Sequence, residues 1–67
     1  MRDLTKAQFE KALERNGFEK VIGGIQDKQH KVTFMTLGTS GVKRRSLLSY
    51  VIEQRKNYYE RHNYELL

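Results

Sequence analysis

Three consecutive cations, Lys43, Arg44 and Arg45, follow a glycine-flanked loop that contains Thr39 and Ser40. We expect this loop to lead into a helix, with Thr39 or Ser40 as its N-cap. The amino end of a helix carries roughly half a positive charge, so cations placed there oppose the helix dipole. Free N–H groups at that end favour anions, and the two hydroxyls add further donors. The pattern therefore predicts a phosphate-binding site.

Backbone phosphates of RNA or DNA are the ligands that such a site would suit, and Lys31 adds a further cation to it. A local rule is often broken at a functional site, and a bound phosphate would reverse the unfavourable effect of these cations on the helix. In the alternative, the cations are solvated or pair with acidic side chains of neighbouring elements, namely Glu10, Glu19 or Asp27.

Residue types that could perform catalysis are sparse. His30 and His62 are the only imidazoles, and with no cysteine in the chain they do not form the spacing of a metal site. His30, after a predicted turn, could serve as a general acid or base, although a lone exposed histidine is also common on ordinary surfaces. No serine has the surroundings of a hydrolase nucleophile, and no glycines match a nucleotide-binding fingerprint. We therefore expect no catalysis, no metal and no small-molecule cofactor.

Length and charge limit the classes of protein that remain. The chain has 67 residues, a net charge of +5 and no cysteine, so neither a disulfide nor a thiolate–zinc site stabilises it. A chain this short predicts a single domain over 1–67 with a small core. No apolar run approaches the roughly 18 residues of a membrane span, and the N-terminus lacks the apolar stretch of a signal peptide. We expect a cytoplasmic protein whose positive charge attracts polyanions.

The clearest element is a helix over about 5–16. Thr5 and Gln8 have the spacing of a capping box, and Leu4 with Phe9 has that of a hydrophobic staple. Gly17 is placed to end the helix in the left-handed conformation.

Residues 18–37 have the composition of β structure, because "FEKVI" and "KVTFMTL" are rich in β-branched and aromatic side chains. Between them, Gly23-Gly24 is either a bulge within one long strand or a tight turn before a short extra strand. We favour the bulge and two strands, because a stub of two or three residues adds little pairing.

The second helix, which follows the cations, has no internal glycine or proline and is expected to run to about Tyr59 or His62. A helix of some 20 residues spans roughly 30 Å, longer than a short strand, so its distal half should overhang the sheet. Tyr58 and Tyr59 lie in that half. They predict packing against the first helix or against a partner, and together with exposed strand edges they indicate a homodimer.

These elements predict an α+β fold of order α-β-β-α. Both helices lie on one face of a two-stranded, alternatively three-stranded, antiparallel sheet.

Two known folds resemble this arrangement. The order of elements, with a helix that opens in a basic run, resembles the double-stranded-RNA-binding fold, and this implies that Lys43, Arg44 and Arg45 grip phosphates across a groove of the duplex. The α-β-β-β-α HicA-type toxins are similar in "N-G-F" at the end of the first helix and in a histidine at the start of a strand, here His30. That resemblance implies a ribonuclease.

A closer resemblance is to short bacterial proteins of no assigned activity, which have the pattern "R-x-[LM]-T-x-x-Q-F", then "G-F", then "R-R-x-x-L-x-Y". The matching residues here are Arg2, Leu4, Thr5, Gln8, Phe9, Gly17, Phe18, Arg44, Arg45, Leu48 and Tyr50.

The sequence thus favours a nucleic-acid-binding module that grips phosphates with the three consecutive cations, helped by Lys31, Thr39 and Ser40. The first alternative is a protein-interaction module or homodimer that uses Tyr58 and Tyr59. A HicA-like ribonuclease is the second.

Overall fold

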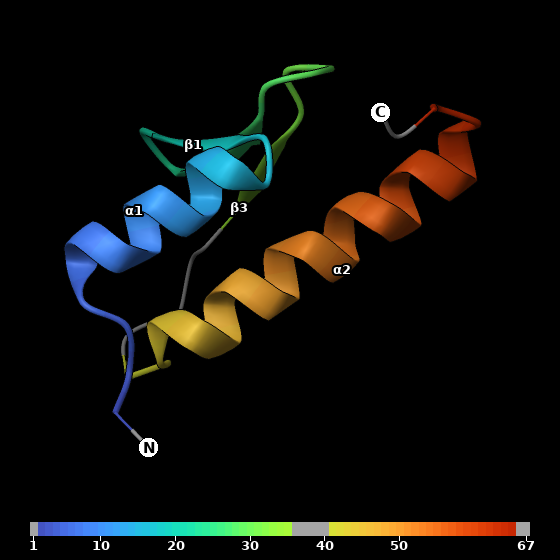
Figure 1. The fold of residues 1–67 in the computed structure, drawn as a ribbon. Helices are drawn as coiled ribbons and strands as arrows, with labels where there is room; N and C mark the ends of the chain where they lie inside the picture. The colour runs from blue at the N-terminus through green and yellow to red at the C-terminus, as the bar shows by residue number, and fades with distance from the viewer. Residues whose placement is uncertain (1, 36–40, 66–67) are drawn as a thin grey trace.

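In a computed structural model, which describes residues 2–35 and 41–65, the chain forms two helices and three strands in the order α-β-β-β-α (Figure 1). The α+β class and the helix–strands–helix order predicted from the sequence are confirmed. The elements are α1 (Lys6–Arg15), β1 (Phe18–Val21), β2 (Gly24–Asp27), β3 (Thr33–Met35) and α2 (Arg44–His62).

Helix α1 begins and ends as its sequence predicts. The Thr5 hydroxyl accepts from the Gln8 amide at 3.1 Å, and the Gln8 side chain accepts from the Thr5 amide at 2.9 Å, which completes the capping box. Gly17 follows the last turn with a φ of +78°, a conformation that favours glycine. The helix buries Phe9, Ala12 and Leu13 on one face.

The sheet has three antiparallel strands in the order β1-β2-β3, so the preferred prediction of two strands is wrong and its three-stranded alternative is correct. The chain turns at Ile22 and Gly23, where Gly23 has a φ of +88°, instead of continuing through a bulge. The extra strand is not a stub, because β2 is the central strand and pairs on both edges. Ile25, for example, lies opposite Lys20 on one side and Phe34 on the other. A strand as short as β2 would be weakly held by one neighbour, but two neighbouring strands stabilise it.

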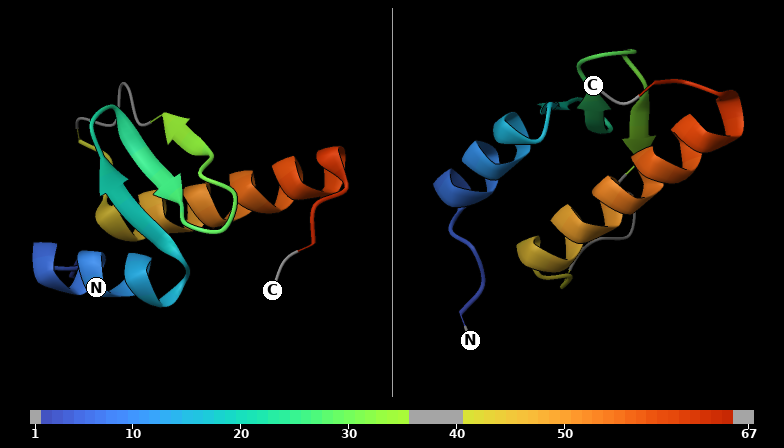
Figure 2. Two further views of the ribbon diagram at one scale, coloured as in Figure 1. Left: turned by 90° about the horizontal axis from the view of Figure 1, so that it is seen from above. Right: turned by 45° about the vertical axis from the view of Figure 1, so that its right-hand side comes forward.

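Both helices pack on the same face of the sheet and run in the same direction (Figures 1 and 2). The strand register places Phe18, Ile25 and Phe34 on that face, since directly opposed residues point to the same side. The core forms there between α1, the sheet and α2. Its buried members are Phe9, Leu13, Phe18, Ile25 and Val51.

The distal half of α2 packs on its own chain. The helix ends at Asn63, whose φ of +57° is left-handed, and the chain then turns back so that the Tyr64 amide donates to the Tyr59 carbonyl at 2.9 Å. Tyr64 stacks on His30 of the β2–β3 connection, with ring centroids 4.2 Å apart. The end of α2 that was expected to overhang the sheet is therefore covered by this connection and by the tail.

Candidate functional site

The start of α2 is capped by a residue from the other end of the sequence. The Asp3 carboxylate accepts hydrogen bonds from the backbone amides of Arg44, at 2.8 Å, and Arg45, at 2.9 Å. The Arg44 guanidinium donates to the Leu4 carbonyl at 3.2 Å, which holds the same N-terminal segment from a second side. The negative charge that the helix dipole favours is thus already present, and it explains how α2 tolerates a start rich in cations.

This arrangement corrects the predicted cap. The N-cap of α2 is Lys43, whose side chain makes no capping hydrogen bond, and the helix begins at Arg44. Thr39 and Ser40, which the sequence predicted as N-cap and as phosphate donors, lie outside the described residues. A local hydroxyl cap is unnecessary here because an acidic side chain 41 positions away satisfies the amides.

Asp3 is held in its ionised form by these contacts. Hydrogen bonds from the Arg45 amide and then the Arg44 amide lower the pKa of the Asp3 carboxyl below its usual value of 3.8. The positive charge of Arg44 acts in the same direction. The carboxylate is therefore charged at neutral pH, where it caps α2.

The three consecutive cations do not form a single cluster. Arg44 lines a hollow beside α1 and β1 that also contains Asp3, Lys6 and Lys20. Arg45, the next residue of the helix, lines a different hollow, between α1 and α2. Lys43 precedes both and is exposed. The structure thus separates residues that the sequence grouped together.

The hollow between the helices, which we call the helix groove, has a consistent charge. Three of its lining side chains are cationic, Lys11 and Arg15 from α1 and Arg45 from α2, and no carboxylate belongs to its lining as far as the structure describes it. The floor is apolar or uncharged. Leu4, Gln8, Ala12 and Leu48 complete the lining.

Sequence reasoning missed Lys11 and Arg15. Their spacing of four residues places them on the same side of α1, next to the buried Ala12, and this pattern was visible in the sequence. Nothing in the sequence showed that this side of α1 faces Arg45, because that depends on how the two helices pack.

Lys31 is not brought to the other predicted contacts. It lies between β2 and β3, with a φ of +59°, and its carbonyl accepts from the Gln26 side chain at 3.4 Å. The neighbouring Gln29 and His30 contact Glu65 and Tyr64 after the end of α2. Lys31 is thus at the end of α2 opposite to Lys43–Arg45 (Figure 1).

Tyr58 and Tyr59, predicted as a partner surface, are largely used within the chain. Tyr59 is 2% exposed and its hydroxyl donates to the carboxylate of Asp27, which is itself buried. Tyr58 is half-buried, and its ring meets that of Phe34 edge to face at 6.1 Å between centroids. A buried tyrosine bonded to a buried carboxylate is a core feature of the protein.

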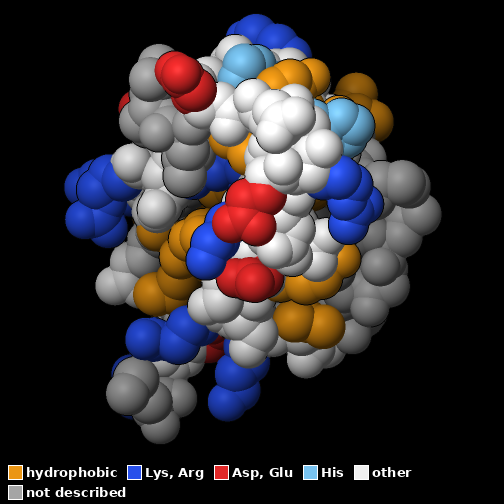
Figure 3. All heavy atoms as spheres, turned by 90° about the vertical axis from the view of Figure 1, so that its right-hand side faces the viewer, with side chains coloured by type: hydrophobic (Ala, Val, Ile, Leu, Met, Phe, Trp, Pro, Cys, Tyr) orange, Lys and Arg blue, Asp and Glu red, His pale blue; other side chains and the backbone are white. Residues whose placement is uncertain are grey.

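Both imidazoles lie at the surface near the end of α2 (Figure 3). The ring of His30 stacks on Tyr64 and lies edge to face against Tyr59, while the ring of His62 is tilted against that of Tyr58, with centroids 4.2 Å apart. The His30 amide donates to Asp27 at 3.3 Å, which fixes the turn. The structure thus surrounds His30 with aromatic side chains.

No three side chains of the described residues gather in a way that could hold a metal ion. The described helices include none that is long and apolar enough to cross a bilayer.

Comparison of the chain with known protein families, with curated proteins and with solved structures finds no match.

Proposed function

We propose that this protein binds nucleic acid through its backbone phosphates, in the helix groove. The observation that carries the proposal is the lining of that groove, in which Lys11, Arg15 and Arg45 come together from two helices without a carboxylate. Cations repel one another when packing brings them together, and a bound polyanion removes that repulsion. Contacts of this kind bind the phosphates of any sequence.

The site differs from the one that the sequence favoured. Of the three consecutive cations, only Arg45 lines the helix groove, whereas Lys43 is the exposed N-cap residue of α2. Arg44 is engaged with the N-terminal segment through Leu4 and Asp3. The amides at the start of α2 contribute less than expected, because a phosphate would have to displace the Asp3 carboxylate.

The fold is compatible with this proposal. With its third strand, the chain has the α-β-β-β-α order of the double-stranded-RNA-binding and HicA-type folds that the sequence resembles. Duplex RNA is therefore the first ligand to test, with duplex DNA and single strands beside it.

Fluorescence anisotropy with a labelled RNA duplex, measured over a range of salt concentrations, tests the proposal. The affinity should fall as salt rises, with a slope of log K against log salt near −0.9 for each phosphate neutralised. Arg45→Gln and Lys11→Gln should each weaken binding and reduce the slope by about one. Arg61→Gln, which removes a cation from the last turn of α2, is the control and should leave binding unchanged. Equal effects of all three variants would contradict a defined site.

A protein-interaction function is the second proposal, and it now depends on other residues than Tyr58 and Tyr59. Ile22 is fully exposed in the β1–β2 turn, and Tyr50 is half-exposed on α2. The outer edges of β1 and β3 carry unpaired backbone groups within the described sheet. Sedimentation of the wild type and of Ile22→Lys tests for a homodimer. Association through apolar surface and strand edges should respond little to salt.

The ribonuclease alternative places His30 as a general acid or base on bound RNA. Its imidazole is accessible from solvent and stacked on Tyr64. In that case His30→Ala should abolish RNA cleavage and leave RNA binding intact. Loss of binding together with cleavage would indicate a structural role for this ring.

A further inference from the structure

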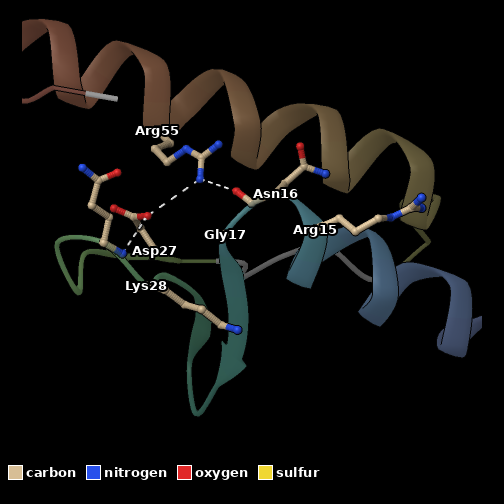
Figure 4. A pocket seen from close by; sticks show the side chains of 7 residues that line it. Arg15, Asn16, Gly17, Asp27, Lys28 and Arg55 are labelled. Carbon is tan, nitrogen blue, oxygen red and sulfur yellow. Dashed lines mark hydrogen bonds and ion pairs between the residues drawn. The ribbon is translucent and has the colours of Figure 1, made fainter. Parts of the chain in front are cut away.

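A second hollow, which we call the far hollow, lies at the end of α1 (Figure 4). Arg15 belongs to the lining of both hollows, so the two are neighbours. The far hollow brings together the end of α1, the end of β2 and the middle of α2. Its lining residues are Arg15, Asn16, Gly17, Asp27, Lys28, Gln29 and Arg55.

Arg55 supplies a fixed positive charge to the far hollow. Its side chain is only 11% exposed, and its guanidinium lies 4.1 Å over the ring of Phe18. One terminal nitrogen donates to the Asn16 carbonyl and lies 3.7 Å from Asp27. Its buried Nε has no hydrogen-bond partner among the described residues. These contacts hold the guanidinium in one position, so no side-chain entropy is lost when an anion approaches.

The single carboxylate of the far hollow is already occupied. Asp27 is buried and accepts from the Tyr59 hydroxyl and from the amides of Gln29 and His30, both at 3.3 Å. Charge-assisted hydrogen bonds of this kind stabilise the carboxylate locally. Within the lining, Asp27 is one carboxylate against three cations, Arg15, Lys28 and Arg55, and it faces Arg55 at 3.7 Å. The far hollow therefore has a positive excess.

We infer that the far hollow is a second phosphate-binding site, occupied by the same nucleic-acid backbone that lies in the helix groove. The inference rests on the proposed function and extends it to the length of the ligand. Arg45 and Arg55 are ten residues apart on α2, a rise of about 15 Å. Each strand of a DNA duplex rises about 3.4 Å per nucleotide, so on that duplex the distance spans four or five nucleotides. The ligand is therefore an extended backbone, and neither a free nucleotide nor inorganic phosphate bridges both sites.

Two measurements test this inference. The first compares Lys28→Gln, which changes the far hollow, with Arg45→Gln, which changes the helix groove, and with Arg61→Gln, which lines neither. On an RNA duplex of about twelve base pairs, Lys28→Gln and Arg45→Gln should each reduce the salt slope by about one. The second measures amide NMR shifts in the wild type with that duplex, with a dinucleotide and with inorganic phosphate.

The duplex should shift the amides of both Lys11, which lines only the helix groove of the two hollows, and Lys28, which lines only the far hollow. The dinucleotide and inorganic phosphate should not shift both amides together. If Arg45→Gln weakens binding and Lys28→Gln does not, phosphate binding in the far hollow is refuted, while binding in the helix groove is supported. If Lys28→Gln alone weakens binding, phosphate binding in the helix groove is refuted instead. Unchanged binding in both variants would overturn both the proposed function and this inference. Lys28 is exposed, so its substitution does not endanger folding, as substitution of Arg55 would.

Discussion

At the scale of single residues, Asp3 has the clearest role, because it caps a helix that begins 41 positions later. Its contacts lower the pKa of the folded carboxyl, so Asp3 stabilises the fold at pH values above its unfolded pKa. That contribution disappears as the pH falls through the lower, folded pKa. Asp3→Asn should therefore lower the melting temperature at neutral pH, and the difference from the wild type should shrink below the usual pKa of 3.8.

Thermal unfolding followed by circular dichroism between neutral pH and strongly acid solution checks this. The matched control is Glu53→Gln, which removes another exposed carboxylate, from the middle of α2. A difference for Asp3→Asn that stayed constant down to the lowest pH would show that the charge of Asp3 does not matter.

The hydroxyl of Tyr59 makes a second prediction at this scale. Tyr59→Phe would leave the buried Asp27 carboxylate without its side-chain hydroxyl donor and should cost about 1–3 kcal/mol of unfolding free energy. Tyr58→Phe is the comparison, because the Tyr58 hydroxyl makes no hydrogen bond within the described residues, and it should change stability by about 0.5 kcal/mol at most. Urea denaturation of the two variants gives both values. Equal losses in the two variants would show that the hydrogen bond between Tyr59 and Asp27 does not stabilise the fold.

At the scale of elements, the two helices begin in different ways. Helix α1 has a local capping box, whereas α2 begins after Lys43 and takes its cap from Asp3. Thr5→Ala should therefore destabilise the protein by about 0.5–2 kcal/mol. Lys43→Ala should have little effect, and Thr5→Ser should restore most of the loss. The midpoints of denaturant unfolding give the comparison, provided that the slope of free energy against denaturant is the same for all variants. A large loss of stability for Lys43→Ala would contradict the role of Asp3 as the cap.

The same contrast shows what could be predicted from the sequence. The capping box and Gly17 at the end of α1 are local patterns, and the structure contains both. The three-stranded sheet was expected only as the alternative, because a short central strand is stabilised by its two neighbours and its own composition does not show this. The Asp3 cap, the Tyr59–Asp27 bond and the helix groove depend on contacts between remote residues. No local spacing encodes them.

At the scale of the whole molecule, the cations that line the helix groove and the far hollow follow one another across the surface. From Arg45 the cations continue through Lys11 and Arg15 to Lys28, across two helices and a turn. A ligand that binds these cations only in the folded chain stabilises folding, by about 2.7 kcal/mol when present at one hundred times its dissociation constant.

Excess RNA duplex at low salt should therefore raise the melting temperature of the wild type. The increase should be smaller for Arg45→Gln than for Arg61→Gln. An equal increase in both variants would mean that the net charge of +5, and not its arrangement, determines the effect.

Hydrogen exchange can follow the two hydrogen bonds between Asp3 and the start of α2. The first amides of a helix usually have no acceptor and exchange with solvent quickly. The amides of Arg44 and Arg45 do have one, but only after a loop of about 40 residues has closed. Their exchange therefore reports when the N-terminal segment leaves the helix, and protection as strong as that of Val51 would show that the two separate only on global unfolding.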